Sequence, residues 1–568
     1  MEISKFAKMS GVLVLTSILF SCDNPKTDTQ KEKPPEVHSK KLTETSTNTG
    51  NTCTKTYPSF WQDPGFSAMW EGQLISNAPP SDWKGPIFKL SDQYPRKPVD
   101  DKSAQPWRAA KFDRLFDPTI SQADKETLSV EYAESVLAYI MAGNVNQPNK
   151  TDWDVCENPV RPWFHIPFQT YDPMSGREFT HGLTREAPVA FSIQSSDQID
   201  HSTMWAVGFY NATAAYTLGQ VWQKDGTAKM PKNDISFMDG AVIGKPLFNT
   251  STPDKLPVLE NMPAWKANIS DPTFCSCKPA SGGECTLVEE SQQCPRSTSK
   301  WNDVRLLQFD IAVKDSRAPG TQWVYGTFVA DGIRKAKAKT AWDRLSLLGL
   351  MWGNDTPPEG ELAYNYPSDP RTNGFMEEVI IWDTVDELNK YGGNNPVQHM
   401  GHLGCNTRLN GPADNANSSC MSCHGTASAP DLSLTTPPLQ AQFSGALTNE
   451  CVTPSESDPN SGTDRSGAPS KVENKISFAA MDSIYFANVP GGKPFNMTVK
   501  NEDGVLTNVM GDGVPHYANT ERKDWISLDY SLQMSISLKQ WMQWQQHQKI
   551  DAEKRIHAFE IRRNESNN

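Results

Sequence analysis

The chain has 568 residues with a formal net charge of −13 at pH 7, and 37% of its residues are hydrophobic. That length is enough for about two to four domains. The acidic balance argues against nucleic acid as a partner, because phosphate binding needs a basic face, and it suits a protein partner that carries basic patches.

Residues 1–22 have the composition of an export signal. Lys5 and Lys8 precede the apolar run 11–20, which is too short to cross a bilayer as a helix. The run ends two residues before Cys22, and the four residues LFSC that end there resemble the lipobox of bacterial lipoproteins. The resemblance implies that Cys22 is lipidated and that the exported chain is held at a membrane by this lipid anchor, facing the periplasm or anchored in the outer membrane. An ordinary secretory signal is the alternative.

Residues 23–57 are rich in Lys, Thr, Pro, Asn and Glu and contain few large apolar side chains. Such a segment buries too little surface to offset the entropy of its chain. The composition therefore predicts a flexible tether between the anchor and the folded part of the protein.

Residues 58–390 predict a large β-rich, sandwich-like body of unknown role. Apolar residues alternate from Leu307 to Val313, which indicates a half-buried strand, and residues 125–142 form the main helical pattern. Further strands are predicted within 204–222, 240–249 and 323–332. No repeat of propeller length is present, which disfavours a quinoprotein dehydrogenase.

Three histidines of this body, His165, His181 and His201, lie close together in the sequence, near Glu178. A metal site or an acid–base site could be built from them. Because no helical or hairpin spacing links them, separate core or loop histidines are the simpler interpretation.

The cysteines divide into two groups. Setting aside Cys22, Cys420 and Cys423 leaves eight of the eleven, an even number that predicts disulfides in an exported protein. These eight are Cys53, Cys156, Cys275, Cys277, Cys285, Cys294, Cys405 and Cys451. The four between residues 275 and 294 predict a disulfide-linked surface loop, with a zinc knuckle as the rival.

Cys420, Cys423 and His424 form the sequence Cys-x-x-Cys-His, the attachment motif of c-type haem. Residues three apart share one face of a helix, so both sulfurs can reach the two vinyl groups at one edge of a porphyrin. The next residue can present its imidazole to the iron. A thioredoxin-like redox pair, a zinc site and a plain disulfide are the alternatives, and each lacks a supporting feature in the surrounding sequence.

Around this motif, roughly residues 396 to 550 resemble the class I c-type cytochromes, and we expect a cytochrome c-like haem domain over residues 391–550. The resemblance implies one haem c, thioether bonds at Cys420 and Cys423, His424 as the proximal iron ligand, and a mainly α fold. It also implies a distal methionine before a last helix, and Met481 is the first candidate. Other candidates are Met497, Met510, His399, His402 and His516.

The last helix is predicted from Ser527 onward. Ser527 can cap it, Asp529 suits its first turn, and no Gly or Pro follows up to the end of the chain. The residues after Ser527 also alternate with period two, so a strand is the alternative at its start. Residues 551–568 are predicted to be a polar tail.

The predicted fold class is therefore α+β, with a β-rich N-terminal body and a mainly α C-terminal haem domain. The predicted function is one-electron transfer with a redox protein partner outside the cytoplasmic membrane, and an electron carrier is favoured over an enzyme. The alternatives are a haem-dependent oxidoreductase or peroxidase with its substrate site in the body, and a haem-based redox or gas sensor.

Overall fold

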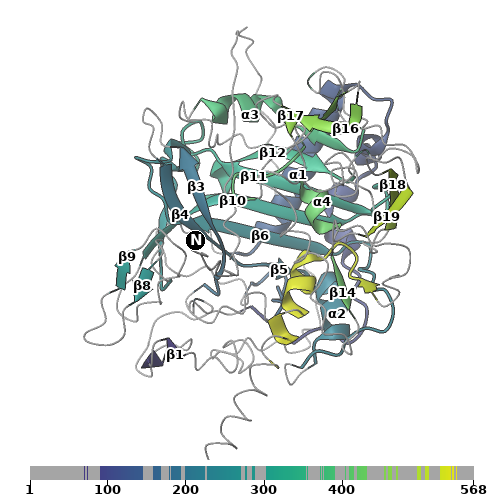
Figure 1. Ribbon diagram of the computed structural model, residues 1–568, viewed down its shortest axis with the longest axis horizontal. Coiled ribbons are helices and arrows are strands. Elements are labelled where there is room, and N and C mark those ends of the chain that lie inside the picture. The colour runs from purple at the N-terminus through teal and green to yellow at the C-terminus, as the bar shows by residue number, and fades with distance from the viewer. Residues whose placement is uncertain are drawn as a thin grey trace, which may run out of the picture.

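The computed structural model describes most of the chain between residues 90 and 390 and shorter parts of the remainder. The described residues are 69–70, 73–74, 90–91, 93–144, 158–167, 178, 181–192, 199–223, 227–269, 275–277, 285–287, 302–353, 355, 371, 374, 376–390, 403, 408–414, 419–425, 427–430, 453–455, 458–463, 469–470, 496–500, 506–510, 525–538, 540–542 and 545. Within them the protein is α+β, with one large antiparallel sheet and a few helices (Figure 1).

The large sheet has nine strands, seven of them in the order β13-β12-β11-β10-β6-β4-β3. The two others pair at its sides, β5 with β6 and β7 with β10. Its strands are β3 (Thr184–Ser192), β4 (Ile199–Ala206), β5 (Phe209–Tyr210), β6 (Val242–Asn249), β7 (Ala264–Ala267), β10 (Asn302–Lys314), β11 (Trp323–Ala330), β12 (Leu345–Met351) and β13 (Glu378–Ile380).

The helices of the described residues are few, as the sequence predicts. The labelled α-helices are α1 (Gln122–Met141), α2 (Ala212–Val221), α3 (Trp382–Asn389) and α4 (Cys420–His424), and further helical residues lie between 532 and 545. Short 3-10 helices cover Lys102–Ala104, Pro106–Arg108, Ala110–Phe116, Pro257–Leu259 and Trp342–Arg344. The predicted helix 125–142 is confirmed as α1, which begins at the cap Ser121, whose hydroxyl accepts from the Asp124 N–H.

Small sheets account for the remaining strands. They pair β1 (Met69–Trp70) with β2 (Gln73–Leu74), β8 (Cys275–Cys277) with β9 (Cys285–Leu287), β14 (Ser428–Pro430) with β20 (Trp525–Ser527), β15 (Thr453–Ser455) with β16 (Asp458–Thr463), β16 with β17 (Pro469–Ser470), and β18 (Asn496–Lys500) with β19 (Leu506–Met510). The register of β8 and β9 places Cys277 opposite Cys285.

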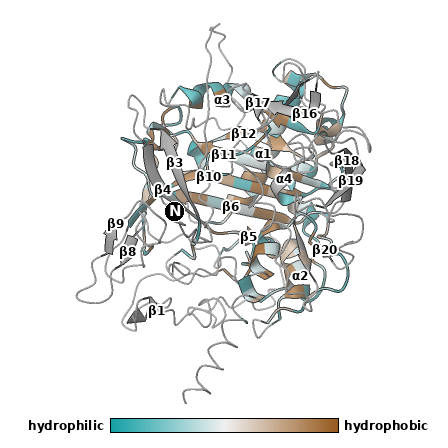
Figure 2. Ribbon diagram, in the orientation of Figure 1, coloured by the Kyte–Doolittle hydropathy of each residue, from teal (hydrophilic) through white to brown (hydrophobic). Residues whose placement is uncertain are grey.

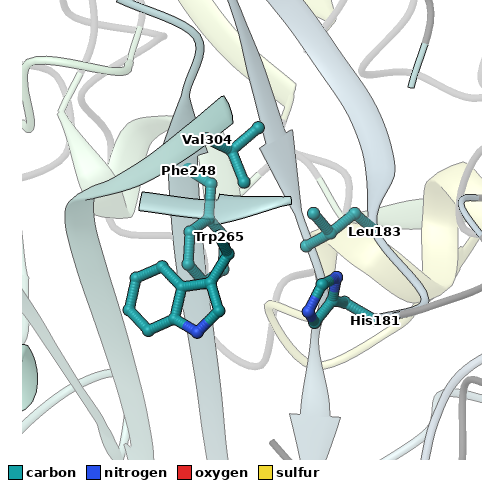
Figure 3. Close-up of a pocket in the computed structure, with 5 residues that line it drawn as sticks. All are labelled: His181, Leu183, Phe248, Trp265 and Val304. Atoms are coloured by element: carbon teal, nitrogen blue, oxygen red, sulfur yellow. The ribbon is translucent and has the colours of Figure 1, made fainter. Parts of the chain in front are cut away.

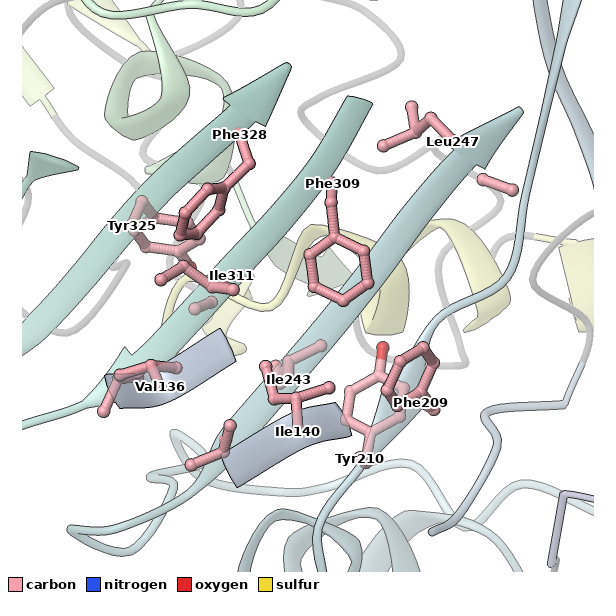
Figure 4. Packing of buried hydrophobic residues seen from close by; sticks show 14 of the residues in the cluster. Val136, Ile140, Phe209, Tyr210, Ile243, Leu247, Phe309, Ile311, Tyr325 and Phe328 are labelled. Carbon is pink, nitrogen blue, oxygen red and sulfur yellow. The ribbon is translucent and has the colours of Figure 1, made fainter. Parts of the chain in front are cut away.

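One face of the central strands is apolar and packs under α1. Phe309 and Ile311 of β10 are buried on this face, where Val136 and Ile140 of α1 approach them (Figure 4). Gly244 of β6 lies opposite Ile311, and a side chain in its place would meet Ile140. These residues confirm the strands predicted at 240–249 and 307–313.

The other face of the same strands is polar, and Gln308 and Lys314 on it are buried as well. Gln308, Asp310 and Lys314 alternate with the apolar residues of β10, and Figure 2 shows such hydrophilic positions interspersed along β6 and β10. The C-terminal part of the chain covers this face, as the contact of Lys314 with Asp529 illustrates. The prediction that β10 is half-buried was therefore wrong. Its buried polar side chains contact residues distant in the sequence, such as Asp529, and are not exposed to water. Helices and connecting segments, and not a second large sheet, cover this sheet within the described residues, so the sandwich-like expectation is corrected too.

The segment 204–222 is part strand and part helix, whereas its sequence predicts strands throughout. It contains the end of β4, then β5, then α2. Asn211 explains the change, because its side-chain oxygen accepts from the Ala214 N–H and caps the first turn of α2. The alanines that follow favour a helix once that cap is in place.

The C-terminal segment begins as a strand and becomes helical later than predicted. Ser527 is the last residue of β20 and does not cap a helix, and helical residues cover 532–538, 540–542 and 545. This helix lies beside α2 (Figure 1), where the rings of Trp222 and Trp541 meet edge to face at 6.5 Å. Buried residues such as Met421 and Leu538 join those of the large sheet in one apolar cluster.

Candidate functional site

The Cys-x-x-Cys-His motif forms one turn of helix, α4 (Cys420–His424). The backbone N–H of Cys420 donates to the Leu409 carbonyl at 3.1 Å, which fixes the start of the turn. Met421 is 1% exposed, and its N–H lies 3.4 Å from the sulfur of Met351 in β12. The motif is therefore packed directly onto the large sheet.

Two residues of the motif, Cys420 and His424, share one face of α4 and approach strand β11. Cys420 and His424 are four residues apart, and Cys423 occupies a position on the same helical face. The sulfur of Cys420 lies 3.9 Å from the Thr327 hydroxyl, and the ring centroids of His424 and Tyr325 are 4.3 Å apart. The structure thus places Cys420 and His424 against β11, and Cys423 belongs to the same helical turn.

His424 has the tautomer and the protonation state of a metal ligand. Its Nδ1 lies 2.8 Å from the Tyr530 carbonyl, which can only accept, so Nδ1 carries the proton. Burial lowers the pKa of His424 to about 4, although the Tyr530 carbonyl acts in the opposite direction. The imidazole is therefore neutral near pH 7, and its Nε2, which has no hydrogen bond to a described residue, keeps a lone pair.

The Tyr530 carbonyl is held in position by an unusual turn. Asp529 and Tyr530 have φ angles of 50° and 63°, a left-handed conformation that costs on the order of 1–3 kcal/mol for a residue such as tyrosine. The turn follows β20, in which Ile526 pairs with Ala429 of β14. The Leu528 N–H donates to the Ala427 carbonyl at 3.0 Å. The strand pair thus links the turn directly to the residues that follow α4.

Asp529 anchors this turn to the body of the protein. One carboxylate oxygen accepts from the Lys314 ammonium at 2.8 Å and from the Trp323 indole N–H at 3.1 Å. The other oxygen accepts from the Phe237 N–H at 2.7 Å. Asp529 and Lys314 are almost completely buried. Hydrogen bonds from three protein donors therefore replace the hydration that the carboxylate has in the unfolded chain. Sequence placed Asp529 in the first turn of a helix, and that prediction was wrong.

A polar cluster lies next to Cys420. The Thr327 hydroxyl donates to Asp310 at 3.0 Å, and the Gln308 amide donates both to Asp310 and to Asp414 at 2.8 Å. Burial raises the pKa of Asp310, with a further rise from Asp414, and burial raises the pKa of Asp414 as well. Because both pKa values are raised, these two carboxyl groups, which the Gln308 amide bridges, carry less negative charge than two exposed carboxylates would.

These features fit the chemistry of haem c. Two cysteines on one helical turn match a pair of vinyl groups, and a neutral histidine with its Nδ1 proton on a carbonyl matches an axial ligand. Protein carbonyls commonly hold metal-binding imidazoles in this way, because the bond fixes the tautomer and the ring orientation.

The structure does not describe the predicted distal ligand or the predicted lipid site. Met481 and Cys22 lie outside the described residues, as do His399, His402 and His516. Met497 belongs to β18 and Met510 ends β19. Of the eight predicted disulfide cysteines, Cys53, Cys156, Cys294, Cys405 and Cys451 also lie outside the described residues.

The histidines of the body occupy separate surroundings. His165 is buried with Nδ1 3.2 Å from the Gly208 carbonyl, and His201 belongs to β4. His181 lies 3.5 Å from the carboxylate of Glu178. Within the part of the chain that the structure describes, no three His, Cys, Asp or Glu residues form a group able to hold a metal ion.

His181 borders a small apolar pocket at one end of the sheet (Figure 3). Its ring faces Trp265, and the pocket has no room for a water molecule. The other lining residues are Leu183, Phe248 and Val304. This pocket gives the His181 ring an apolar neighbourhood.

Sequence reasoning missed the residues around the motif, namely Tyr325, Thr327 and Tyr530. Tyr325 and Thr327 alternate on a predicted strand, which identifies them as neighbours of each other but not of α4. The Tyr530 carbonyl carries no sequence signal, because every residue has one.

Comparisons with protein-family models, with curated proteins and with solved structures found no match for this chain. Among the helices that the structure describes, none combines the length and the apolar composition needed to cross a bilayer.

Proposed function

We propose that the chain binds one haem c covalently and carries single electrons outside the cytoplasmic membrane. Each thiol of Cys420 and Cys423 would add across one vinyl group, giving a carbon–sulfur bond with no atom lost. The iron supplies the one-electron redox change when haem is bound. The observation that supports this most is the motif turn α4, with Nδ1 of its histidine held by the Tyr530 carbonyl.

His424 would be the proximal iron ligand through Nε2. Its neutral state favours coordination, because a protonated imidazole has no lone pair for a metal. Met481 is the proposed distal ligand, on the basis of the resemblance to class I c-type cytochromes. Residues 391–550 would then form a cytochrome c-like haem-binding region that packs on the β-rich body.

The proposed location follows from the N-terminal region. Lipidation of Cys22 would attach the exported chain to a membrane, with residues 23–57 as a flexible tether. The net charge of −13 suits a redox partner with a basic surface. We propose no nucleic acid partner.

The test is to express the full-length chain, with its export signal, in a bacterial host able to mature c-type cytochromes. Haem should stay with the chain on a denaturing gel, and a pyridine haemochrome spectrum should show the c-type product. The double variant Cys420→Ala/Cys423→Ala should lose this haem completely. Cys285→Ala, a matched cysteine variant in β9, should keep it.

Absence of covalent haem in the wild-type chain under these conditions would overturn the proposal.

Carbon monoxide binding to the haem-containing protein separates a carrier from an enzyme or sensor. Failure of the reduced protein to bind it, with a near-infrared sulfur-to-iron band in the oxidised form, supports a methionine-ligated carrier. Rapid binding would indicate an open iron site and contradict Met481 as a ligand.

A further inference from the structure

The Tyr530 carbonyl accepts two hydrogen bonds at once. Nδ1 of His424 donates to it at 2.8 Å, and the Tyr325 hydroxyl donates to it at 2.9 Å. Both donors are neutral; the Tyr325 side chain is buried, and His424 is half-buried. A carbonyl oxygen has two lone pairs, so both bonds can form, but they draw on the electron density of the same oxygen.

The strength of the bond from His424 matters for an axial ligand. A strong acceptor at Nδ1 makes the imidazole more basic, and a more basic ligand stabilises the oxidised iron. The reduction potential of a haem therefore falls as this hydrogen bond strengthens. A residue that weakens or strengthens this hydrogen bond therefore changes the reduction potential of the haem, even if it does not contact the iron.

Tyr325 and Asp529 act on this bond from opposite sides. Tyr325 withdraws electron density from the carbonyl, and its ring also contacts the His424 ring. Asp529 holds the carbonyl in place, because its three donors, Lys314, Trp323 and the Phe237 N–H, fix a turn with two left-handed residues. A left-handed tyrosine would relax to another conformation without such an anchor.

We propose that Tyr325 and Asp529 are positioning residues that set how strongly the Tyr530 carbonyl accepts from His424, and thereby the reduction potential. The inference rests on the proposed function, since it needs haem iron bound to His424. Tyr325 raises the potential by sharing the carbonyl. Asp529 lowers it by keeping the carbonyl aligned with Nδ1.

Tyr325→Phe tests the first half, because it removes the hydroxyl and keeps the ring. In the full-length holoprotein, the ratio of oxidised to reduced protein at a fixed ambient potential should rise about fivefold, a fall of about 40 mV. The matched control is Tyr94→Phe, since Tyr94 is also buried and donates to a backbone carbonyl, that of His165. The control should lose stability in urea without changing the potential.

Asp529→Asn tests the second half by weakening the attachment to Lys314, and it should raise the potential. If this variant does not fold, the reduction potential of Tyr325→Phe still tests the proposal. A folded Tyr325→Phe protein that carries covalent haem with an unchanged or higher potential would overturn the inference. Loss of covalent haem from the wild-type chain would instead overturn the proposed function, so the two failures are distinguishable.

Discussion

Glu378 is a completely buried carboxyl group at the end of the large sheet. Its Oε2 accepts from the Leu409 N–H at 3.0 Å, and its Oε1 lies 3.7 Å from the Arg408 guanidinium. Burial raises the pKa of Glu378 to about 8, although Arg408 acts in the opposite direction. The folded protein therefore holds this proton at pH values where the unfolded chain has released it.

We expect the free energy of unfolding to fall as the pH rises from 4.5 to about 8. The raised pKa makes the folded state the stronger proton binder, so this group contributes a loss of up to about 1.4 kcal/mol per pH unit in that interval. Glu378→Gln removes the titration and keeps an acceptor for Leu409. Its unfolding in urea should depend less on pH, and above pH 8 it should be more stable than the wild type.

Glu131→Gln is the control, because Glu131 is exposed on α1 and pairs with Lys111 at the surface. It should change the free energy of unfolding by less than about 0.5 kcal/mol and leave the pH dependence intact. A pH dependence of Glu378→Gln identical to that of the wild type would contradict the assignment.

For individual residues, the sequence predicts the members of the motif but not the residues that contact it. Covalent attachment fixes residue types and spacing, so Cys420, Cys423 and His424 are readable from five consecutive positions. Tyr530 lies 106 residues from His424 and offers only a backbone group, and Tyr325 lies 205 residues from Tyr530. Contacts over such separations depend on the tertiary fold, which local patterns do not encode.

Individual elements were predictable where one pattern dominates. The long apolar alternation of β10 and the capped helix α1 are such cases. The start of α2 was missed, because the apolar run before it continues a strand pattern and the cap at Asn211 depends on its folded surroundings. The C-terminal helix began too early in the prediction, because the left-handed turn before it contains no glycine.

Asn211 is expected to stabilise more than one element. Its side-chain oxygen accepts from the N–H groups of Ala214 and Val242, and its amide donates to the Gly240 carbonyl, so it joins α2 to β6. Asn211→Ala leaves these buried groups without partners and should lower the free energy of unfolding by about 2–4 kcal/mol. Urea unfolding measures the loss.

Ser121→Ala is the matched cap variant, because Ser121 caps α1 with a single hydrogen bond at the surface. It should cost about 1 kcal/mol. Equal losses for the two variants would show that the buried bonds of Asn211 add nothing to its role as a cap.

Among the residues that the structure describes, one apolar cluster spans the predicted body and the predicted haem region. Met421, Leu528 and Trp541 from the C-terminal part belong to the same cluster as Phe309 and Ile311 of the sheet. The polar face of β10 depends on this part as well, since Lys314 has Asp529 as its buried partner. The two regions therefore complete each other's cores.

We expect residues 391–568 expressed alone to lack a cooperative fold. Without the sheet, Asp529 loses Lys314 and Trp323, and the apolar side of α4 loses the strands that cover it. Circular dichroism during urea unfolding should show no sigmoidal transition for the fragment and a sigmoidal transition for the full-length chain. A fragment as stable as the full-length protein would establish an independent haem domain.

The central claim, covalent attachment of one haem at α4, is tested most directly by the intact mass of the exported protein. The proposal predicts an increase equal to one complete haem over the mass of the processed chain, because both thiols add to vinyl groups without loss of atoms. The Cys420→Ala/Cys423→Ala protein should show no such increase. A wild-type protein with the mass of the bare processed chain, made in a host that matures c-type cytochromes, would contradict the account.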